Sequence, residues 1–318
     1  MNHFQEHLIC PACANALTSE WLCTGCGTRY EAPGGILNLR IASDARVELV
    51  RRFYEYAPFP GYSECDSLSS LRARAERNKF ARLLDQAIPG NARILEMGCG
   101  TGQMSLYLAR ADRLVIGADL TRTSLELAGA AAHRFKLDRV LFVETDLHRP
   151  GLRPGSFDVV YSSGVLHHTP NPRASFARIA QLARPGGMIV LGVYNAIARV
   201  PHRLRRMVAR WSHYRLIPFD PVLRSRKNEP ARREAWLRDQ YLHPEEHRHT
   251  LGEVQKWFVE NDVEFVRAYP SALIGEDPDN LFAFAADNWL VEGWLAQLGW
   301  IHALGHEGGL FVTVGQRR

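Results

Sequence analysis

Short apolar runs alternate with amphipathic stretches through the middle of the chain. The runs cover residues 93–97, 114–120, 140–147, 157–168 and 188–195. They are rich in Val, Ile and Leu and lack strict alternation, which is typical of strands buried on both faces. The stretches at 103–110, 124–135 and 173–184 have helical periodicity. The pattern therefore predicts a doubly wound α/β sheet with a ligand crevice at the carboxyl ends of its strands.

The last quarter of the chain predicts further elements beside this core. Thr250 followed by Glu253 indicates a capping box that opens a helix over 251–260. Apolar runs at 263–271 and 308–316 predict two final strands.

Composition is that of an ordinary globular protein, with 318 residues, 46% hydrophobic and 23% charged. No stretch resembles a transmembrane span. The N-terminus, MNHFQEHLICPAC, lacks the basic and apolar regions of a secretory signal. We therefore expect a cytoplasmic protein in a reducing compartment. The net charge of +5 is too mild to indicate a nucleic-acid-binding protein by itself.

Four of the six cysteines form two CxxC pairs near the N-terminus: Cys10, Cys13, Cys23 and Cys26. Four thiolates on two hairpin-like turns suit a tetrahedral Zn²⁺ ion. A module of forty residues buries little apolar surface, so metal binding would supply its folding free energy. We therefore predict a structural zinc ribbon, with two disulfides or four thiols without metal as the alternative. Cys65 and Cys99 are expected to stay free.

A glycine loop follows the first apolar run, with the spacing Gly98-x-Gly100-x-Gly102. It lacks the Gly-Lys-Ser/Thr ending of a phosphate-binding loop, and Gln103 takes the place of the third glycine of a dinucleotide fingerprint. Three carboxylates stand at successive strand ends: Glu96, Asp119 and Asp146. They suit a ligand that offers hydroxyls and amines, and they would repel phosphates.

The segments ILEMGCGTG, GADL, ETDL, FDVVYSSGVLHHTP and RPGGMIVLGVYN resemble the successive motifs of class I S-adenosylmethionine-dependent methyltransferases of the type 11 kind. The resemblance covers residues 93–195. It implies a seven-stranded Rossmann-like sheet whose last two strands form an antiparallel edge. It also implies S-adenosylmethionine as the cofactor.

The resemblance implies a cofactor site at the glycine loop and the strand ends. The three glycines would pack against the methionine part, Asp119 would accept bonds from the ribose hydroxyls, and Asp146 would meet the adenine amino group. The implied contact residues are Glu96, Gly98, Gly100, Gly102, Asp119, Leu120, Asp146, Leu147 and Gly164. The alternatives are that the two aspartates cap turns and that Glu96 bonds the loop backbone.

Candidate catalytic residues come from two places. His167 and His168 follow the fourth strand, with structural histidines at a turn as the alternative. Tyr241 and His243 belong to a polar cluster before Thr250, for which loop architecture is the alternative. Such a general base is needed only where the acceptor must lose a proton.

Two segments flank the expected core. The aromatic and proline-rich run 53–62 predicts a lid over the cofactor, with Tyr54 and Tyr56 as contacts, or else an interdomain strap. A helix over 198–211 carries arginines on one face: Arg199, Arg203, Arg206 and Arg210. It predicts either a solvated cap or a landing surface for RNA, an acidic carrier protein or a membrane.

We divide the chain into five parts. They are a zinc-ribbon module (1–40), an aromatic linker and lid (41–80), a cofactor-binding core (81–195), a basic helical cap insertion (196–250) and a final helix with two strands (251–318). The leading hypothesis is methyl transfer to a small-molecule or carrier-bound metabolite. A second is an RNA methyltransferase, because the layout is similar to zinc-bearing bacterial rRNA guanine methyltransferases. A third is a non-catalytic partner-binding protein. The acceptor atom and the oligomeric state stay open.

Overall fold

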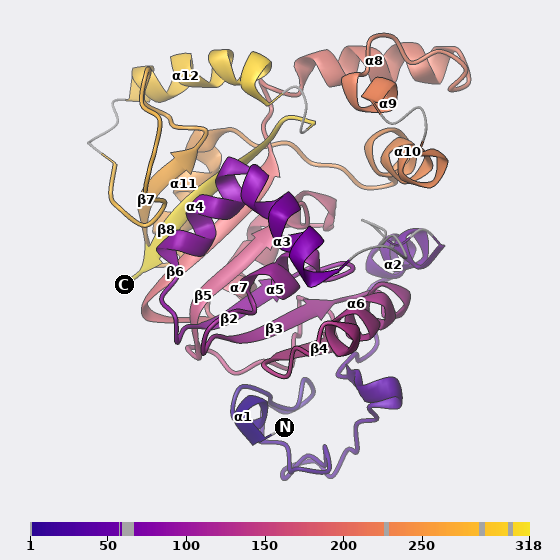
Figure 1. Cartoon of the computed structure of the whole chain (residues 1–318), viewed down its shortest axis with the longest axis vertical. Helices are drawn as coiled ribbons and strands as arrows, with labels where there is room; N and C mark the ends of the chain where they lie inside the picture. The colour runs from indigo at the N-terminus through magenta and orange to yellow at the C-terminus, as the bar shows by residue number, and fades with distance from the viewer. Residues whose placement is uncertain (1, 57, 59–66, 226–228, 286–289, 305–307) are drawn as a thin grey trace.

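The computed structural model describes residues 2–56, 58, 67–225, 229–285, 290–304 and 308–318. Its centre is a mostly parallel sheet (Figure 1). In sheet order the strands are β1 (Leu37–Asn38), β4 (Val140–Glu144), β3 (Leu114–Asp119), β2 (Arg93–Met97), β5 (Phe157–Ser163), β6 (Ala183–Tyr194), β8 (Leu310–Arg317) and β7 (Val263–Tyr269).

The predicted strands are confirmed. The five apolar runs form β2 to β6 and pair in parallel, and β8 runs antiparallel to both β6 and β7. Beyond the seven expected strands, two residues of β1 pair with β4, a strand too short for an apolar pattern to predict. The helix expected over 173–184 ends at Ala180, because β6 begins at Ala183.

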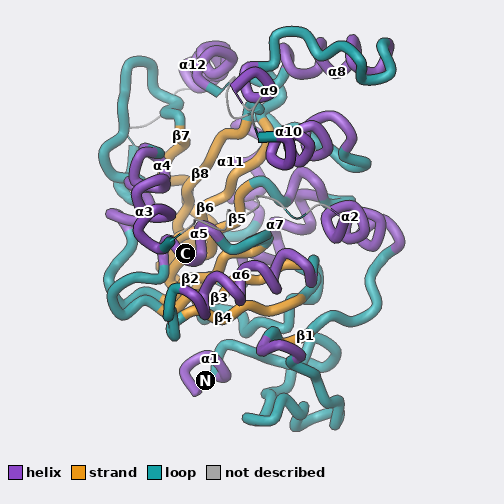
Figure 2. Tube along the Cα trace, turned by 45° about the vertical axis from the view of Figure 1, so that its right-hand side comes forward, coloured by secondary structure: helices purple, strands orange, loops and turns teal. Residues whose placement is uncertain are grey.

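Helices cover both faces of the sheet (Figures 1 and 2). The α-helices are α1 (Asn2–Gln5), α2 (Ala45–Tyr56), α3 (Leu68–Arg77), α4 (Lys79–Ala87), α5 (Gln103–Leu108), α6 (Arg122–Arg134), α7 (Pro172–Ala180), α8 (Val200–Trp211), α9 (Pro221–Ser225), α10 (Pro230–Leu237), α11 (Leu251–Glu260) and α12 (Leu290–Ala303). Three single turns complete the described elements: η1 (Pro33–Gly35), η2 (Leu166–His168) and the π-type η3 (Arg238–Leu242).

Two apolar cores lie on the two faces of the sheet. Residues of α4, α5 and α6 pack on one face, with Leu106 and Leu125 fully buried. Residues of α7 and α11 pack on the other, where the rings of Phe176 and Phe258 stack at 5.1 Å. The predicted capping box is confirmed at the start of α11, where Thr250 and Glu253 exchange side-chain bonds with each other's backbone N–H groups.

The N-terminal segment forms a small module at one end of the molecule (Figure 1). Short antiparallel bridges hold it together, and Leu8 pairs in the same way with Leu152 of the core. The Ile9 N–H donates to the Gly151 carbonyl at 2.9 Å. The segment 41–80 is largely helical, forming α2, α3 and the start of α4, where the sequence indicated a linker. Residues 57 and 59–62 of the predicted lid lie outside the described residues, as does Cys65.

No described helix combines the length and the apolar character needed to cross a membrane.

Candidate functional site

A cavity of about 640 Å³ opens at the carboxyl ends of the central strands. One end is formed by the glycine loop and by acids at or just after the carboxyl ends of β2, β3 and β4. The opposite wall comes from α2, α3 and η3, with Tyr54, Asp239 and Gln240 among its residues. The crevice predicted at the carboxyl ends of the strands is therefore present, and helices line its opposite side.

The glycine loop is shaped by backbone that other residues rarely adopt. Gly98 has φ +78°, and a Cβ there would lie 2.2 Å from Val165. Gly102 has φ +73° and caps α5, where a Cβ would meet Phe142 at 2.7 Å. Side chains at these positions would push the loop off the strands. At Gly98 and Gly100 the loop presents backbone to the cavity, and Cys99 between them also lines it.

Asp119 lies between the loop and the cavity. Its Oδ2 accepts a bond from the Gly100 N–H at 2.7 Å, and its Oδ1 accepts from the Thr121 N–H at 2.8 Å. Burial raises the pKa of this carboxyl above its usual value, while the bonds from Thr121 and Gly100 act in the opposite direction. The Thr121 hydroxyl also donates to Oδ1. A carboxylate has about four lone-pair positions, so the remaining acceptor capacity of Asp119 toward a ligand is at Oδ2.

Asp146 lines the same cavity beyond β4. Its Oδ1 accepts from the His148 N–H at 2.9 Å, and its Oδ2 accepts from the Ser43 hydroxyl at 2.8 Å. Burial favours its neutral form, but the bonds from His148 and Ser43 hold its pKa below the usual value. Asp146 is therefore an anion at neutral pH.

Glu96 is buried at the end of β2 and also lines the cavity. The Ser105 hydroxyl of α5 donates a hydrogen bond to it. Burial raises the pKa of Glu96 to about 8. The structure thus pairs Glu96 with a side chain of α5, a partner that the sequence did not indicate.

The other predicted cofactor contacts fall into two groups. Leu120, Leu147 and Gly164 line the cavity together with the acids. Gly102 lies behind that lining, at the start of α5.

A hydrogen-bonded group of four side chains forms the opposite wall. The Tyr54 hydroxyl donates to Asp239 Oδ1 at 2.7 Å, and Gln240 Nε2 donates to Asp239 Oδ2 at 2.7 Å. Gln240 Nε2 also lies 2.6 Å from the Tyr194 hydroxyl oxygen. These bonds connect α2, η3 and the end of β6 across the cavity. Tyr54, one of the two predicted lid contacts, therefore belongs to the cavity wall.

The predicted catalytic histidines differ in position. His168 lines the cavity, and its Nδ1 lies 2.7 Å from the Glu245 carbonyl oxygen. Because a carbonyl only accepts, Nδ1 carries the proton and Nε2 keeps a lone pair. Burial lowers the pKa of His168 to about 4, so the ring is neutral at pH 7.

His167 and His243 lie behind His168. His167 is fully buried, stacks on Tyr194 at 3.7 Å, and has no hydrogen-bond partner for either ring nitrogen among the described residues. The His243 ring packs at a tilt against His168, with 3.6 Å between the ring centroids, and burial lowers the pKa of His243 to about 3. Both rings support the position of His168.

Two residues predicted to contact the cofactor or the acceptor do not line the cavity. Tyr241 is buried beneath α8 and α9, where its hydroxyl donates to Asp220 Oδ2 at 2.6 Å, and within the described chain it lies outside the cavity lining. Tyr56 is exposed, with the Arg238 guanidinium 4.5 Å from its ring centroid.

Several lining residues had no signal in the sequence. The cavity is lined by Arg51 of α2, Arg74 of α3, Asn78 between α3 and α4, and Trp236 of α10. None stands in a motif or at a strand end, so only the packing of these helices over the sheet brings them to the site.

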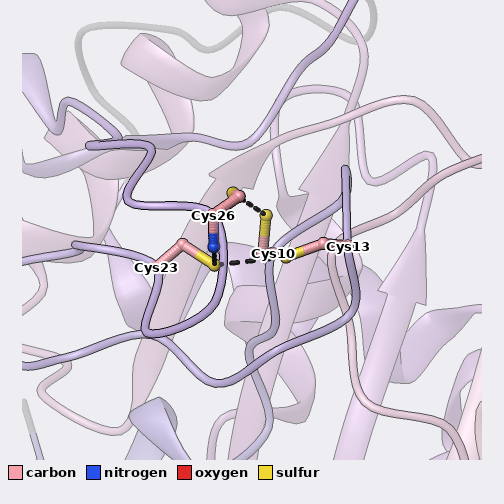
Figure 3. Close-up of side chains that lie close together, drawn as sticks. All are labelled: Cys10, Cys13, Cys23 and Cys26. Atoms are coloured by element: carbon pink, nitrogen blue, oxygen red, sulfur yellow. Dashed lines mark hydrogen bonds between the residues drawn. The ribbon is translucent and has the colours of Figure 1, made fainter.

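The four N-terminal cysteines converge in the small module (Figure 3). All four are free thiols, and their sulfur atoms lie within 4.8 Å of one another. The Cys10–Cys26 sulfur distance is 3.7 Å and the Cys13–Cys23 distance is 3.3 Å. Sulfur atoms around a tetrahedral zinc ion lie about 3.8 Å apart. The donor set therefore fits Zn²⁺. Cys99 is also a free thiol, as predicted.

The central part of the chain is similar to a known protein family. Residues 95–191 match the protein family described as the methyltransferase domain. The chain carries a methyltransferase domain.

Several known proteins are similar in sequence to parts of this chain. An uncharacterized protein of Synechococcus sp. is 28% identical over 201 residues, 56% of this chain and 48% of that protein. The 27-O-demethylrifamycin SV methyltransferase of Amycolatopsis mediterranei is 34% identical over 102 residues, 31% of this chain and 38% of that protein. The ubiquinone biosynthesis O-methyltransferase of Xanthomonas campestris is 31% identical over 153 residues, 48% of this chain and 62% of that protein. The chain thus spans about half the length of these curated relatives.

Among solved structures, magnesium protoporphyrin IX methyltransferase from Synechocystis aligns with 87% of this chain and 100% of that chain. The sequence identity is 15% and the TM-score is 0.48.

The methyltransferase domain supplies one end of the cavity. The predicted cofactor contacts, from Glu96 to Gly164, all lie within the matched residues. Tyr54 in α2 and Asp239 in η3 lie outside them, and Tyr194 ends β6 just after the match, so helices outside the matched residues contribute to the opposite wall.

Proposed function

We propose that this protein is an S-adenosylmethionine-dependent methyltransferase that acts on a small-molecule or carrier-bound metabolite. The observation that carries the proposal is one cavity in which the glycine loop and acids face an aromatic, hydrogen-bonded wall. Its volume of about 640 Å³ lies within the usual range of small-molecule sites. The methyltransferase domain supports it, as do relatives named for 27-O-demethylrifamycin SV and for ubiquinone biosynthesis.

The acidic end of the cavity would hold the cofactor. Asp119 and Asp146 would accept hydrogen bonds from its hydroxyl and amino groups, and Gly98 and Gly100 would let it approach the backbone. When bound, S-adenosylmethionine supplies a methyl group on a positively charged sulfur. Carboxylates close to that charge suit it better than they suit a phosphate-bearing nucleotide.

The opposite wall would hold the acceptor. Orientation of two bound reactants contributes roughly 7–11 kcal/mol to such a transfer. Tyr54, Asp239 and Tyr194 offer polar contacts for orienting an acceptor. His168 Nε2 would take the proton of a hydroxyl acceptor, a contribution of about 10²–10⁴ in rate. His168 is proposed as the base because, of the candidate histidines, it is the one that lines the cavity.

The cysteine module would hold one structural zinc ion through Cys10, Cys13, Cys23 and Cys26. The Tyr30 hydroxyl lies 2.9 Å from the Cys10 sulfur, where it can donate to a thiolate. Four sulfur ligands leave no open coordination position, so the ion would stabilise the module and take no part in transfer.

The arrangement favours a small acceptor over RNA. The cysteine module and α8 lie at opposite ends of the molecule (Figures 1 and 2), so they form no continuous surface for a nucleic acid. Arg199, predicted on the basic face of α8, is fully buried and paired with Glu246.

A transfer assay with methyl-labelled S-adenosylmethionine tests the proposal. The purified protein is incubated separately with a small-molecule extract, carrier-bound metabolites and total RNA. We expect label in one of the first two fractions. Label in RNA that ribonuclease releases would contradict the acceptor class. Absence of label from every fraction, together with no binding of S-adenosylhomocysteine, would leave the non-catalytic hypothesis.

A further inference from the structure

Helix α8 presents its apolar side chains to solvent. Leu204, Met207 and Trp211 are 58, 66 and 84% exposed. With Val200 they follow the i, i+4, i+7, i+11 spacing of a single helix face. The exposed Phe219 lies in the loop that follows. We call Val200, Leu204, Met207 and Trp211 the α8 apolar stripe. Contiguous exposed apolar surface of this kind marks an interaction site.

Ion pairs fix this orientation of α8. Arg199 and Arg206 both bond the largely buried Glu246, with N–O distances of 3.0 and 2.8 Å. A buried carboxylate needs a cationic partner, so these two ion pairs hold α8 beside Glu246. The face of α8 that packs inward carries the buried His202 and Ala209. The α8 apolar stripe lies on the opposite side of the helix and points outward.

A basic cleft of about 290 Å³ lies beside the stripe. Its charged residues are Arg203, Arg206, Arg210, Arg248 and Glu246. Four guanidinium groups face one carboxylate, so the cleft has a surplus of positive charge. Burial lowers the pKa of Arg248, and the neighbouring Arg203 acts in the same direction. The His243 ring also lines the cleft, and its buried Nε2 has no hydrogen-bond partner among the described residues. This donor set suits a phosphate group.

A second exposed apolar helix lies at the same end of the molecule. Trp294, Leu295 and Leu298 of α12 are exposed. Both views place α12 and α8 together at the top (Figures 1 and 2). The apolar side chains of two helices therefore mark one end of the protein.

We propose that this end docks on the surface of an anionic phospholipid bilayer. The α8 apolar stripe enters the boundary between headgroups and acyl chains, and the basic cleft binds a lipid phosphate. Exposed Trp, Phe and Leu beside arginines are the composition of interfacial helices. Residues 200–225 contain six arginines and one aspartate, so a second copy of this chain would bring the same charge and be repelled. The proposal does not depend on the methyl-transfer activity.

Vesicle co-sedimentation of the full-length protein tests this docking. The vesicles are phosphatidylcholine alone, or phosphatidylcholine with phosphatidylglycerol. We expect binding to the anionic vesicles at least about tenfold above the neutral ones. The pair Arg203→Gln and Arg210→Gln should weaken it about 30-fold, at about 1 kcal/mol per arginine. The pair Met207→Ser and Trp211→Ser should weaken it at least about tenfold.

Matched controls come from other surfaces. Val259→Ser changes an exposed apolar residue of α11, and Arg178→Gln changes an exposed arginine of α7. Both should bind like the wild type. The proposal is wrong if the wild type binds neither vesicle, or if the four substitutions act no more strongly than the controls. It is also wrong if the wild type is a dimer that Met207→Ser and Trp211→Ser convert to monomers, because the stripe then joins two copies.

Discussion

At the scale of single residues, burial sets the protonation of the groups around the cavity. Glu96, Asp119 and His168 are all enclosed, and burial favours the neutral form of each. Their positions at the carboxyl ends of β2 and β3 and after β5 were readable from the sequence, because parallel strands end at one edge. Their hydrogen-bond partners were not, because Ser105 and Glu245 reach them only through tertiary packing.

Glu96 is predicted to make stability depend on pH. The folded protein keeps this proton up to about pH 8, whereas an unfolded glutamate loses it near pH 4.5. Between those values the folded state binds more protons, so its free energy of unfolding falls as pH rises. Relative to Glu96→Gln, wild type should lose up to about 1.4 kcal/mol per pH unit. Urea unfolding from pH 5 to 8 measures this. The exposed control Glu264→Gln should follow wild type, and parallel curves for Glu96→Gln would contradict the prediction.

His168 is predicted to act as the base for a hydroxyl acceptor. Its Nε2 is unprotonated above about pH 4, so this group should leave turnover unchanged from pH 6 to 8 and reduce it as pH falls toward 4. His168→Asn retains a donor for the Glu245 carbonyl and removes Nε2. It should lower kcat about 10²–10⁴-fold with S-adenosylhomocysteine affinity unchanged. Unchanged kcat would show that no base acts at this position.

At the scale of elements, periodicity predicted α8 correctly but left open which of its faces packs against the protein. The arginines do share one helix face, as the spacing indicated. The sequence could not show that Glu246 is buried 47 residues after Arg199, so it could not show which face turns inward. Helices α2 and α3 were missed for a related reason. Their mean hydropathy is low, and their few apolar residues are ordered by packing over the cavity.

Arg199 is predicted to hold α8 in place. It bonds Glu246 and Gln240, donates to the Gly308 carbonyl, and lies 3.5 Å from the centroid of the Tyr194 ring. Arg199→Met leaves a buried carboxylate with one cation fewer, which should lower the free energy of unfolding by about 3–5 kcal/mol.

The control on the same helix is Arg203→Met, whose side chain is exposed. It should change stability by no more than about 0.5 kcal/mol. Urea denaturation compares the two variants. Equal effects would mean that the buried contacts of Arg199 contribute little.

At the scale of the whole molecule, three regions have separate tasks. The methyltransferase domain supplies the acidic end of the cavity, the added helices supply its opposite wall, and the cysteine module lies at the far end. The doubly wound sheet followed from the alternation of strands and helices. The way the insertion roofs the cavity did not, because no local pattern encodes contacts between η3 and α2.

The cysteine module is predicted to depend on zinc. Elemental analysis should find about one zinc per chain in the wild type and in Cys99→Ser, and almost none in Cys26→Ser. Because a module of this size has little apolar core, Cys26→Ser should also make residues 1–35 sensitive to protease. Zinc retained at the wild-type level in Cys26→Ser would contradict the four-sulfur site.

The most direct test of the central claim is calorimetric titration with S-adenosylhomocysteine. Wild type is compared with Asp119→Ala and with Asp138→Ala, an exposed aspartate away from the cavity, after circular dichroism verifies that each variant is folded. We predict micromolar binding to wild type and Asp138→Ala, and a loss of at least about 100-fold in Asp119→Ala, the size expected when a buried polar partner is removed. A folded wild type that binds no S-adenosylhomocysteine, or an Asp119→Ala variant that binds it equally well, would contradict the account.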